Sequence, residues 1–449
     1  MRITILGNNL TARHFVKHLA NSHQTFQIAL WTYDDVAYPE FENVASCLRF
    51  HGIKNLPNAL LAADVVVNLH ECTDFSMLPD VKKLQLHNVE VVRSLLFHSK
   101  APLIHLSSPF LQCSNRWPNV YEPERDPMAF KAQWPFPEYC ASKLEAETLV
   151  KEASNDCYIV RCVPTYGEGD ETSILTDLIY FSNDGLSWKL GDGDGHMQMA
   201  YVGNVSVALW SAVGRLLSQS TSLDLNKSFE EELGDLTSYD DQSTIKCHDE
   251  TTLKYYQTPN RKHMAFDVEE EDEDDDDDSL PEDSFEFYPL EAKRGFTSFC
   301  TEPSFAEETS EQRIFEIFLI NDDTPKKTVF DTYDQLLYSS KSARSVAQIP
   351  FIPLYYMYLL FAMVVQFAIK VLGPLKFAAM LPNPSFLYFY FHHWTFFNAT
   401  KSLLMLGYKP EFDFKECIDQ CAQYYRGMSK KDVRRFSWQN SMPCTPTQH

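Results

Sequence analysis

A tyrosine and a lysine four residues apart form the pair in this chain best suited to proton transfer. Residues 139–143 read YCASK, and on a helix this spacing places Tyr139 and Lys143 on one face. A phenol ionises near pH ~10 and is a poor base at neutral pH, but an adjacent ammonium favours the phenolate and lowers the phenol pKa. The pair can therefore accept the proton of an alcohol as hydride leaves the carbinol carbon.

Two serines precede this pair at a place where a sheet would present them to a ligand. Ser107 and Ser108 follow the apolar run 103–106, which is predicted as a strand. Open α/β sheets bind ligands along the carboxyl edge of their strands. A hydroxyl at either position can therefore hydrogen-bond the substrate oxygen and orient it towards the phenol. The plainer interpretation of both is a strand-end turn or a helix cap.

The elements that must position these residues alternate along the first half of the chain. Apolar runs predict strands at 3–6, 26–31, 64–69, 103–106 and 157–163, and helical patterns occupy 11–20, 88–98 and 138–153. Such alternation predicts an α/β fold, a Rossmann-type doubly wound parallel sheet. We expect a smaller C-terminal substrate-binding part and a membrane-associated apolar segment beside it.

The pattern changes four times along the chain. Residues 1–216 are predicted to form a dinucleotide-binding domain that carries the catalytic residues. Residues 217–309 are rich in Ser, Asp, Glu and Gln and include ten consecutive carboxylates at 269–278, so we expect a disordered acidic insertion. Residues 310–348 return to the fold, 349–400 form the membrane-associated segment, and 401–449 supply C-terminal helices of the substrate-binding part and a tail.

Composition excludes some classes of partner. The formal net charge of −23 argues against nucleic acid. Eleven cysteines lack the paired spacing of a zinc site, since Cys417 and Cys421 have no second pair nearby, so no metal is expected. The first residues already read as a strand rather than as a secretion leader. We expect reduced thiols and a catalytic domain that faces the cytosol.

Two apolar stretches near the C-terminus suggest contact with a membrane. Residues 353–369 carry no charge, and as a helix they would extend about 25 Å, close to the length that crosses a bilayer core. Tyr355, Tyr356, Tyr358 and Lys370 are of the types that anchor helices at the interface. A second aromatic stretch covers 386–397. The alternative is that this region is buried inside the protein.

Seven segments of the chain match a known family in order. They are ILGNNLTARHFVKHL (5–19), IHLSS (104–108), WPFPEYCASKLEAE (134–147), VRCVPTYGEG (160–169), YVGNVSVAL (201–209), FLINDDTP (318–325) and LGYKPEFDFKE (406–416). On these segments the chain resembles the 3β-hydroxysteroid dehydrogenase/Δ5-4 isomerase family of extended short-chain dehydrogenases. The resemblance covers nearly everything except the insertion.

The resemblance implies a role for each matching residue. It implies Tyr139 as acid and base, Lys143 as its partner and ligand of the nicotinamide ribose, and Ser108 at the substrate oxygen. It implies that the loop with Pro164, Thr165 and Tyr166 lies beside the nicotinamide and that residues 201–204 flank the substrate cleft. It implies NAD as the cofactor and a steroid or sterol as the substrate. It also implies a homodimer that contacts membrane lipid at the endoplasmic reticulum.

The phosphate-binding turn departs from this family. Three glycines are usual there, but Gly7 alone remains, and the turn is one residue short. Ala12 is expected in place of the third glycine, and Asn9 is expected to take the positive φ of the second, because asparagine does so more readily than most residues.

Two further positions of the cofactor site differ from the family. Thr32 ends the second strand instead of an acid, so Asp34 is expected to reach the ribose and to favour NAD over NADP. His70 and Glu71 replace the usual small residues after DVVVNL, and we interpret His70 as structural.

Three functions remain open. The leading hypothesis is NAD-dependent oxidation of a 3β-hydroxysteroid or sterol, and no residue requires the isomerase step. The second keeps this chemistry for another substrate of extended dehydrogenases, which also act on sterol 4-carboxylates, flavonoids and nucleotide sugars. The apolar C-terminal segment argues against nucleotide sugars, because a cleft that faces a membrane suits a hydrophobic substrate. The third is a catalytically weakened, membrane-bound protein of this fold that binds or scaffolds. The altered glycine turn and the acidic insertion favour the third, and the intact Ser, Tyr and Lys set favours the first two.

Overall fold

A computed structural model describes residues 1–22, 26–35, 47–114, 119–122, 127–181, 187–191, 195–237, 313–325, 328–337, 346–433 and 435–442. The chain divides into two units, one made of Met1–Phe229 and Gln312–His449 and the other of Glu230–Glu311. The fold and the site below belong to the first unit. The described part of the second is the end of one helix.

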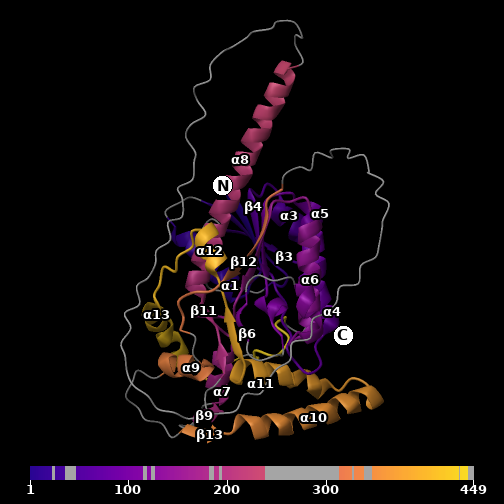
Figure 1. Cartoon of the computed structure of the whole chain (residues 1–449), viewed down its shortest axis with the longest axis vertical. Coiled ribbons are helices and arrows are strands. Elements are labelled where there is room, and N and C mark those ends of the chain that lie inside the picture. The colour runs from indigo at the N-terminus through magenta and orange to yellow at the C-terminus, as the bar shows by residue number, and fades with distance from the viewer. Residues whose placement is uncertain are drawn as a thin grey trace, which may run out of the picture. The chain divides into compact units, whose positions relative to one another are not determined.

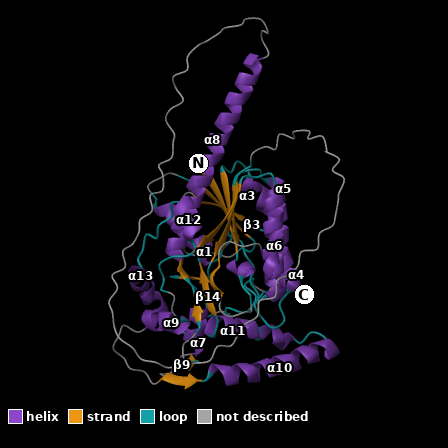
Figure 2. Cartoon of the chain, in the orientation of Figure 1, coloured by secondary structure: helices purple, strands orange, loops and turns teal. Residues whose placement is uncertain are grey.

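A seven-stranded parallel sheet forms the centre of the first unit (Figure 2). Its strand order is β12-β7-β5-β4-β1-β2-β3, and it confirms the predicted doubly wound α/β fold. The strands are β1 (Arg2–Leu6), β2 (Gln27–Thr32), β3 (Cys47–His51), β4 (Val65–Asn68), β5 (Leu103–Ser107), β7 (Cys157–Cys162) and β12 (Phe315–Ile320).

Both faces of this sheet are buried, as uninterrupted apolar strands require. Val65 and Val67 of β4 belong to the larger apolar core, whereas Val66 between them faces a second core. Helices α3 (Leu56–Leu60), α5 (Val91–His98) and α6 (Pro137–Glu152) cover the second core, and α1 (Leu10–Asn21) and α8 (Val202–Thr237) lie on the other face (Figure 1).

Helix α8 corrects the predicted start of the acidic insertion. The loss of apolar pattern placed that start at residue 217, but the helix continues to Thr237. Its first turns bury Val205, Leu209 and Leu216 in the larger core, so packing begins a helix that composition alone did not indicate. The acidic run at 269–278 lies outside the described residues.

Smaller elements complete the unit at the carboxyl edge of the sheet and beyond it. The helices are α4 (Val81–Leu84), α7 (Ile174–Phe181), α9 (Val329–Leu337), α10 (Phe351–Leu372), α11 (Pro384–Phe391), α12 (Thr400–Met405) and α13 (Phe414–Gly427). Short strands pair in three further sheets: β10 (His196–Met197) with β14 (Trp394–Phe397) and β6 (Asn119–Glu122), β11 (Ala200–Tyr201) with β8 (Thr165–Tyr166), and β13 (Val346–Ile349) with β9 (Ser187–Leu190).

The two apolar stretches near the C-terminus have different surroundings. Within the described residues, α10 is the one helix long and apolar enough to cross a membrane, and only 11% of its most apolar window is buried. The second stretch, 386–397, is core instead, because Phe386 and Phe389 are fully buried. The prediction that 349–400 as a whole faces the membrane was therefore wrong for its second half.

Candidate active site

Helix α6 holds the Tyr–Lys pair against the sheet. Its Glu147 accepts two hydrogen bonds from Arg161 of β7, at 2.9 Å from Nε and 2.7 Å from Nη2, and both side chains are buried. One turn nearer the helix start, Lys143 Nζ donates to the carbonyl of Leu106 on β5 at 2.8 Å. These contacts fix the face that carries Tyr139 at the carboxyl edge of the sheet.

Glu71 stands between the tyrosine and the lysine. Its Oε1 accepts the hydrogen bond of the Tyr139 hydroxyl at 2.6 Å and lies 3.2 Å from Lys143 Nζ. The lysine side chain is 1% exposed and the glutamate 19%. The ammonium expected to serve the phenol is thus shared with a carboxylate, which takes up part of its charge.

This arrangement reverses the expected effect on the phenol. Burial, then the charge of Glu71 and the bond to it, raise the pKa of Tyr139 well above its ordinary value near 10, while a hydrogen bond with Ser108 acts in the opposite direction. The prediction that the phenol pKa is lowered was wrong for this arrangement of side chains. The phenol holds its proton while Glu71 accepts its bond.

The loop that carries Glu71 is clamped from both sides. Asn88, in the π-helical turn that joins α4 to α5, accepts from the Cys72 amide at 2.8 Å and donates to the Cys72 carbonyl at 2.9 Å and to Ser142 Oγ at 2.9 Å. Next to Glu71, His70 is fully buried and its Nε2 lies 3.1 Å from His87 Nδ1. Burial lowers the pKa of His70 to about 3, in accord with the structural role proposed for it.

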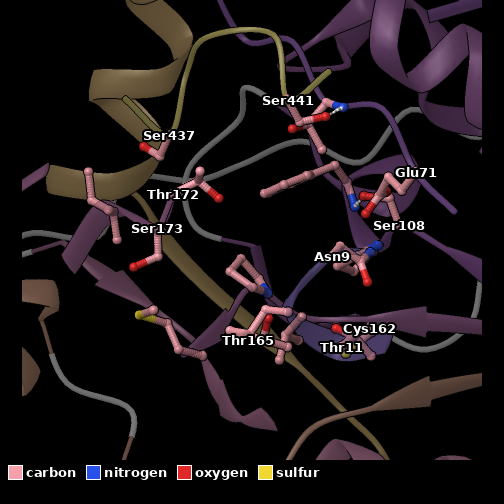
Figure 3. Close-up of a pocket in the computed structure, with 18 of the residues that line it drawn as sticks. Asn9, Thr11, Glu71, Ser108, Cys162, Thr165, Thr172, Ser173, Ser437 and Ser441 are labelled. Carbon is pink, nitrogen blue, oxygen red and sulfur yellow. Dashed lines mark hydrogen bonds between the residues drawn. The ribbon is translucent and has the colours of Figure 1, made fainter. Parts of the chain in front are cut away.

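A cavity of about 210 Å³ opens beside Tyr139. Glu71 and Ser108 lie together on one side of it near Ser441, and Thr172, Ser173 and Ser437 lie on the opposite side (Figure 3). Ser107 also lines it, and its buried Oγ has no hydrogen-bond partner among the described residues. Ser108 Oγ accepts from the Phe110 amide at 3.3 Å, so it is a cap as well as a neighbour of the phenol.

The C-terminal tail closes this cavity, which sequence reasoning missed. The carbonyl of Trp438 accepts from the Phe75 amide at 2.8 Å, and the amide of Ser441 donates to the Thr73 carbonyl at 2.8 Å. Ser441 Oγ in turn accepts from the Thr73 amide at 2.8 Å. The tail thus pairs with the loop that carries Glu71, a contact between distant segments that no local pattern announces.

The β1–α1 turn does not have the conformation expected of it. Gly7 has a φ of +120°, and a Cβ there would lie 2.9 Å from the backbone of Leu69 and His70, so the turn approaches the loop after β4 as closely as only glycine allows. Asn9 has a φ of −69°, and the expected positive φ was wrong. It is the N-cap of α1, because its Oδ1 accepts from the Ala12 amide at 2.9 Å.

The cavity extends from Tyr139 to Asn9 and Thr11 at the β1–α1 turn, and we call this whole length the groove. The Asn9 side chain spans the end of the groove at β1. Its Nδ2 donates to the carbonyl of Leu69 at 2.8 Å, which ties the start of α1 to the loop after β4. The first-turn amides of such a helix are the groups that hold a diphosphate in this type of fold. Here one of those amides already has a partner. Ala12 is fully buried at the helix–sheet contact, where a small residue was expected.

Some of the remaining residues predicted to bind the cofactor line the cavity, and others do not. Pro164 and Thr165 line it, but Tyr166 is buried behind, where its hydroxyl lies 3.1 Å from Thr324 Oγ1. Asp34 follows β2, and its carbonyl accepts from Thr32 Oγ1 at 2.8 Å. Of the segment 201–204, the Tyr201 amide donates to buried Asp322 at 2.8 Å, so this segment ties β11 to the sheet.

NAD, the cofactor expected for this fold, fits one end of this groove better than the other. At the nicotinamide end, Ser107, Ser108 and Tyr139 line an open space, and Lys143 lies one contact behind it. At the other end, diphosphate needs the place that the Asn9 amide now bridges. The cavity is also smaller than the roughly 300–1,000 Å³ of most ligand pockets. In this structure Glu71 holds Tyr139 and Lys143, and Asn9 holds the Leu69 carbonyl, so residues that would meet the dinucleotide are engaged with other partners.

Comparison with solved structures identifies the fold. UDP-glucuronic acid 4-epimerase from Bacillus cereus, in complex with UDP-glucuronic acid and NAD, superposes with a TM-score of 0.51 and 14% identity over 95% of this chain and 99% of that one. A UDP-galactose 4-epimerase gives 0.52 and 13% over 94% and 98%. dTDP-glucose 4,6-dehydratase from Bacillus anthracis, in complex with NAD, gives 0.50 and 12% over 95% and 96%.

These similarities show the extended short-chain dehydrogenase fold. No protein-family model matches the chain, and no curated protein matches it in sequence.

Proposed function

We propose that this chain is a membrane-associated, NAD-dependent oxidoreductase that acts on the secondary alcohol of an apolar molecule. The observation that carries the proposal is that Ser108 and Tyr139 line one cavity at the carboxyl edge of the sheet, with Lys143 behind them, where its Nζ donates to the Leu106 carbonyl and lies 3.2 Å from Glu71. The structural neighbours with NAD in their crystals support the choice of cofactor.

The roles of the residues follow from their contacts. Bound NAD would supply the acceptor for hydride. Ser108 would hold the substrate oxygen beside the phenol. Tyr139 would first lose its own proton, and its phenolate would then take the hydroxyl proton of the substrate. Lys143 is positioned to favour the phenolate and to bind ribose hydroxyls, and both tasks require that Glu71 releases it. First-turn amides of α1 would face the diphosphate.

A 3β-hydroxysteroid or sterol is the proposed substrate. Sequence resemblance to the hydroxysteroid dehydrogenases supports it, and so do the apolar walls that Phe75, Phe110 and Met199 give the cavity. The three solved proteins described above are named as enzymes of nucleotide sugars. A sterol 4-carboxylate is a further candidate within the same chemistry. The homodimer stays a prediction.

We propose attachment to the endoplasmic reticulum, with the sheet facing the cytosol, and helix α10 supports the membrane attachment itself. Its exposed side presents Leu360, Val364 and Phe367, while Ala362 and Val365 pack on the protein. A helix packed on its own domain along one side suits a position in one leaflet, parallel to the surface. Phe367→Glu should abolish flotation with phospholipid vesicles, and Leu61→Glu, another exposed apolar residue, should leave it unchanged.

Turnover tests the proposed reaction. Full-length protein in mild detergent is given NAD and a panel of 3β-hydroxysteroids, and NADH is followed by its absorbance. We expect NADH to form with at least one sterol and Tyr139→Phe to abolish it. Equal rates for the wild type and Tyr139→Phe would reject the assigned chemistry.

A second candidate function has its own support. Glu71 and Asn9 both occupy positions that a dinucleotide needs, which favours a protein of this fold that binds or scaffolds at a membrane without catalysis. Titration with NADH, followed by fluorescence, separates the two functions. Saturable binding supports the oxidoreductase, and its absence from both the wild type and Glu71→Ala supports the binding protein.

A further inference from the structure

A second cavity, with a volume of about 410 Å³, lies among α7, α9 and α11. Its size falls within the roughly 300–1,000 Å³ of small-molecule sites. The lining residues are nearly all apolar, and they are Ile174, Asp177, Leu178, Phe181, Leu190, Phe330, Tyr333, Pro382, Phe386, Leu387, Phe391 and Trp438. Because protein interiors are close-packed, an apolar space of this size is unusual unless something fills it.

Aromatic rings that brace one another form the walls of this cavity. The Phe386 and Trp438 rings meet edge to face at 5.9 Å, and the Phe330 and Phe391 rings lie 5.4 Å apart. Trp438 is fixed by its indole N–H, which donates to the Met380 carbonyl at 3.0 Å. The walls are thus held by contacts outside the cavity and do not need to collapse into it.

One carboxyl group interrupts the apolar lining. Asp177 is 1% exposed, and its carboxyl oxygens accept from the Ser437 amide at 3.1 and 3.2 Å and from the Ser437 hydroxyl. Burial raises the pKa of Asp177 to about 8. Near neutral pH the group therefore carries a proton that it can donate to an oxygen in the cavity, and it does not repel an uncharged ligand.

The cavity wall is continuous with the contact that holds α10. Pro382, which lines the cavity, accepts a hydrogen bond at 2.6 Å from Tyr358 of α10. Ala378, on the segment that leads to Pro382, packs against Ala362 and Val365 of the same helix. Helices α10 and α11 lie side by side at this place (Figure 1). Pro382 thus belongs both to the cavity wall and to the contact that holds the exposed apolar helix α10.

We propose that this cavity binds one uncharged lipid, a largely hydrocarbon molecule with a single hydroxyl or carbonyl end, which enters from the membrane at α10. Its polar end would lie at Asp177 and Ser437, and its bulk among the rings. Sugars and phosphates are excluded because the walls offer them almost no hydrogen bonds. This site is separate from the Tyr139 cavity, with which it shares Ile174, and it does not depend on NAD binding.

Photolabelling tests this site. Full-length protein in phosphatidylcholine vesicles is irradiated with a diazirine analogue of cholesterol, and the labelled peptides are mapped by mass spectrometry. We expect label at Leu178, Phe181 and Leu387, which line this cavity and not the Tyr139 cavity. Excess cholesterol should remove this label, and UDP-glucuronic acid should leave it. Label confined to α10, or competition by the nucleotide sugar alone, would overturn the proposal.

Filling the cavity supplies the control. Leu178→Trp places a larger ring in the lining, and label on α7 and α11 should fall by roughly tenfold. Leu61→Trp, at a residue that is 69% exposed, should leave it unchanged. Leu387→Trp fills the other wall and serves if Leu178→Trp does not fold, as judged by circular dichroism. Unchanged label in a folded, filled variant would reject the site.

Discussion

The two ends of the groove along the carboxyl edge of the sheet differ in the side chains that line them and in the contacts that those side chains make. At the Tyr139 end, Tyr139 of helix α6 and Ser108 after β5 line a cavity, and Lys143 lies behind them. At the β1 end, a single glycine is left, and the Asn9 side chain bridges the turn. Glu71 lies on the loop that joins the two ends. The difference teaches that a Tyr–Lys pair beside a serine does not by itself establish a dinucleotide site, because separate contacts hold the β1–α1 turn.

The largest expected effect concerns the ion pair that holds the Tyr139 end. Arg161→Ala leaves Glu147 buried without its partner and should lower the free energy of unfolding by roughly 3–5 kcal/mol. Urea denaturation followed by circular dichroism measures this. Arg93→Ala removes a cation from an exposed pair with Glu90, where the side chains are 51% and 44% exposed, and should cost no more than about 1 kcal/mol. Equal losses would show that the Arg161 pair does not anchor α6.

Glu71 is expected to compete with a dinucleotide for Tyr139 and Lys143. Glu71→Ala frees Tyr139 and Lys143 for the ribose of a dinucleotide, and because hydrogen bonds to charged groups contribute about 1.5–3 kcal/mol, NADH should bind roughly tenfold tighter or more. Isothermal titration calorimetry measures the change. Glu138 is an exposed carboxylate on helix α6, which carries Tyr139 and Lys143. The control variant Glu138→Ala should therefore bind NADH as the wild type does. Unchanged affinity in Glu71→Ala would show that the carboxylate does not compete with the cofactor.

Gly7 tests the β1 end. In Gly7→Ala the new methyl group meets the backbone of Leu69 and His70 at a φ of +120°, so we expect a loss of about 1–3 kcal/mol in the free energy of unfolding. Gly214→Ala adds a methyl group in open space on helix α8 and should be neutral or slightly stabilising. Thermal melts of the two variants side by side provide the measurement. A stable Gly7→Ala variant would show that the close approach is not required.

The sequence was a good guide to the scaffold and a poor one to the contacts that close the site. Periodic apolar runs located the strands, and the four-residue spacing placed Tyr139 and Lys143 on one face of α6, since both features are local. The hydrogen bond from Tyr139 to Glu71 joins residues 68 positions apart, and the tail reaches the loop at Thr73 from Ser441. No local pattern encodes such pairs. His70 and Glu71 were visible as replacements of small residues, but a replacement alone does not give a side chain's partner.

The smallest expected effect on stability comes from Asn9 and is the most informative about the groove. Glycine is tolerated at an N-cap position, so Asn9→Gly should lower the free energy of unfolding by only a few tenths of a kcal/mol. Alanine is not, so Asn9→Ala should lower it by about 1 kcal/mol. Both variants remove the bridge to the Leu69 carbonyl. If that bridge obstructs the diphosphate, both should bind NADH more tightly than the wild type by a similar factor, despite their different stabilities. If only the more stable variant gains affinity, the cap orders the α1 amides that bind the diphosphate and the bridge is not an obstacle. Measuring unfolding and NADH affinity on the same two variants therefore separates the two effects of one side chain.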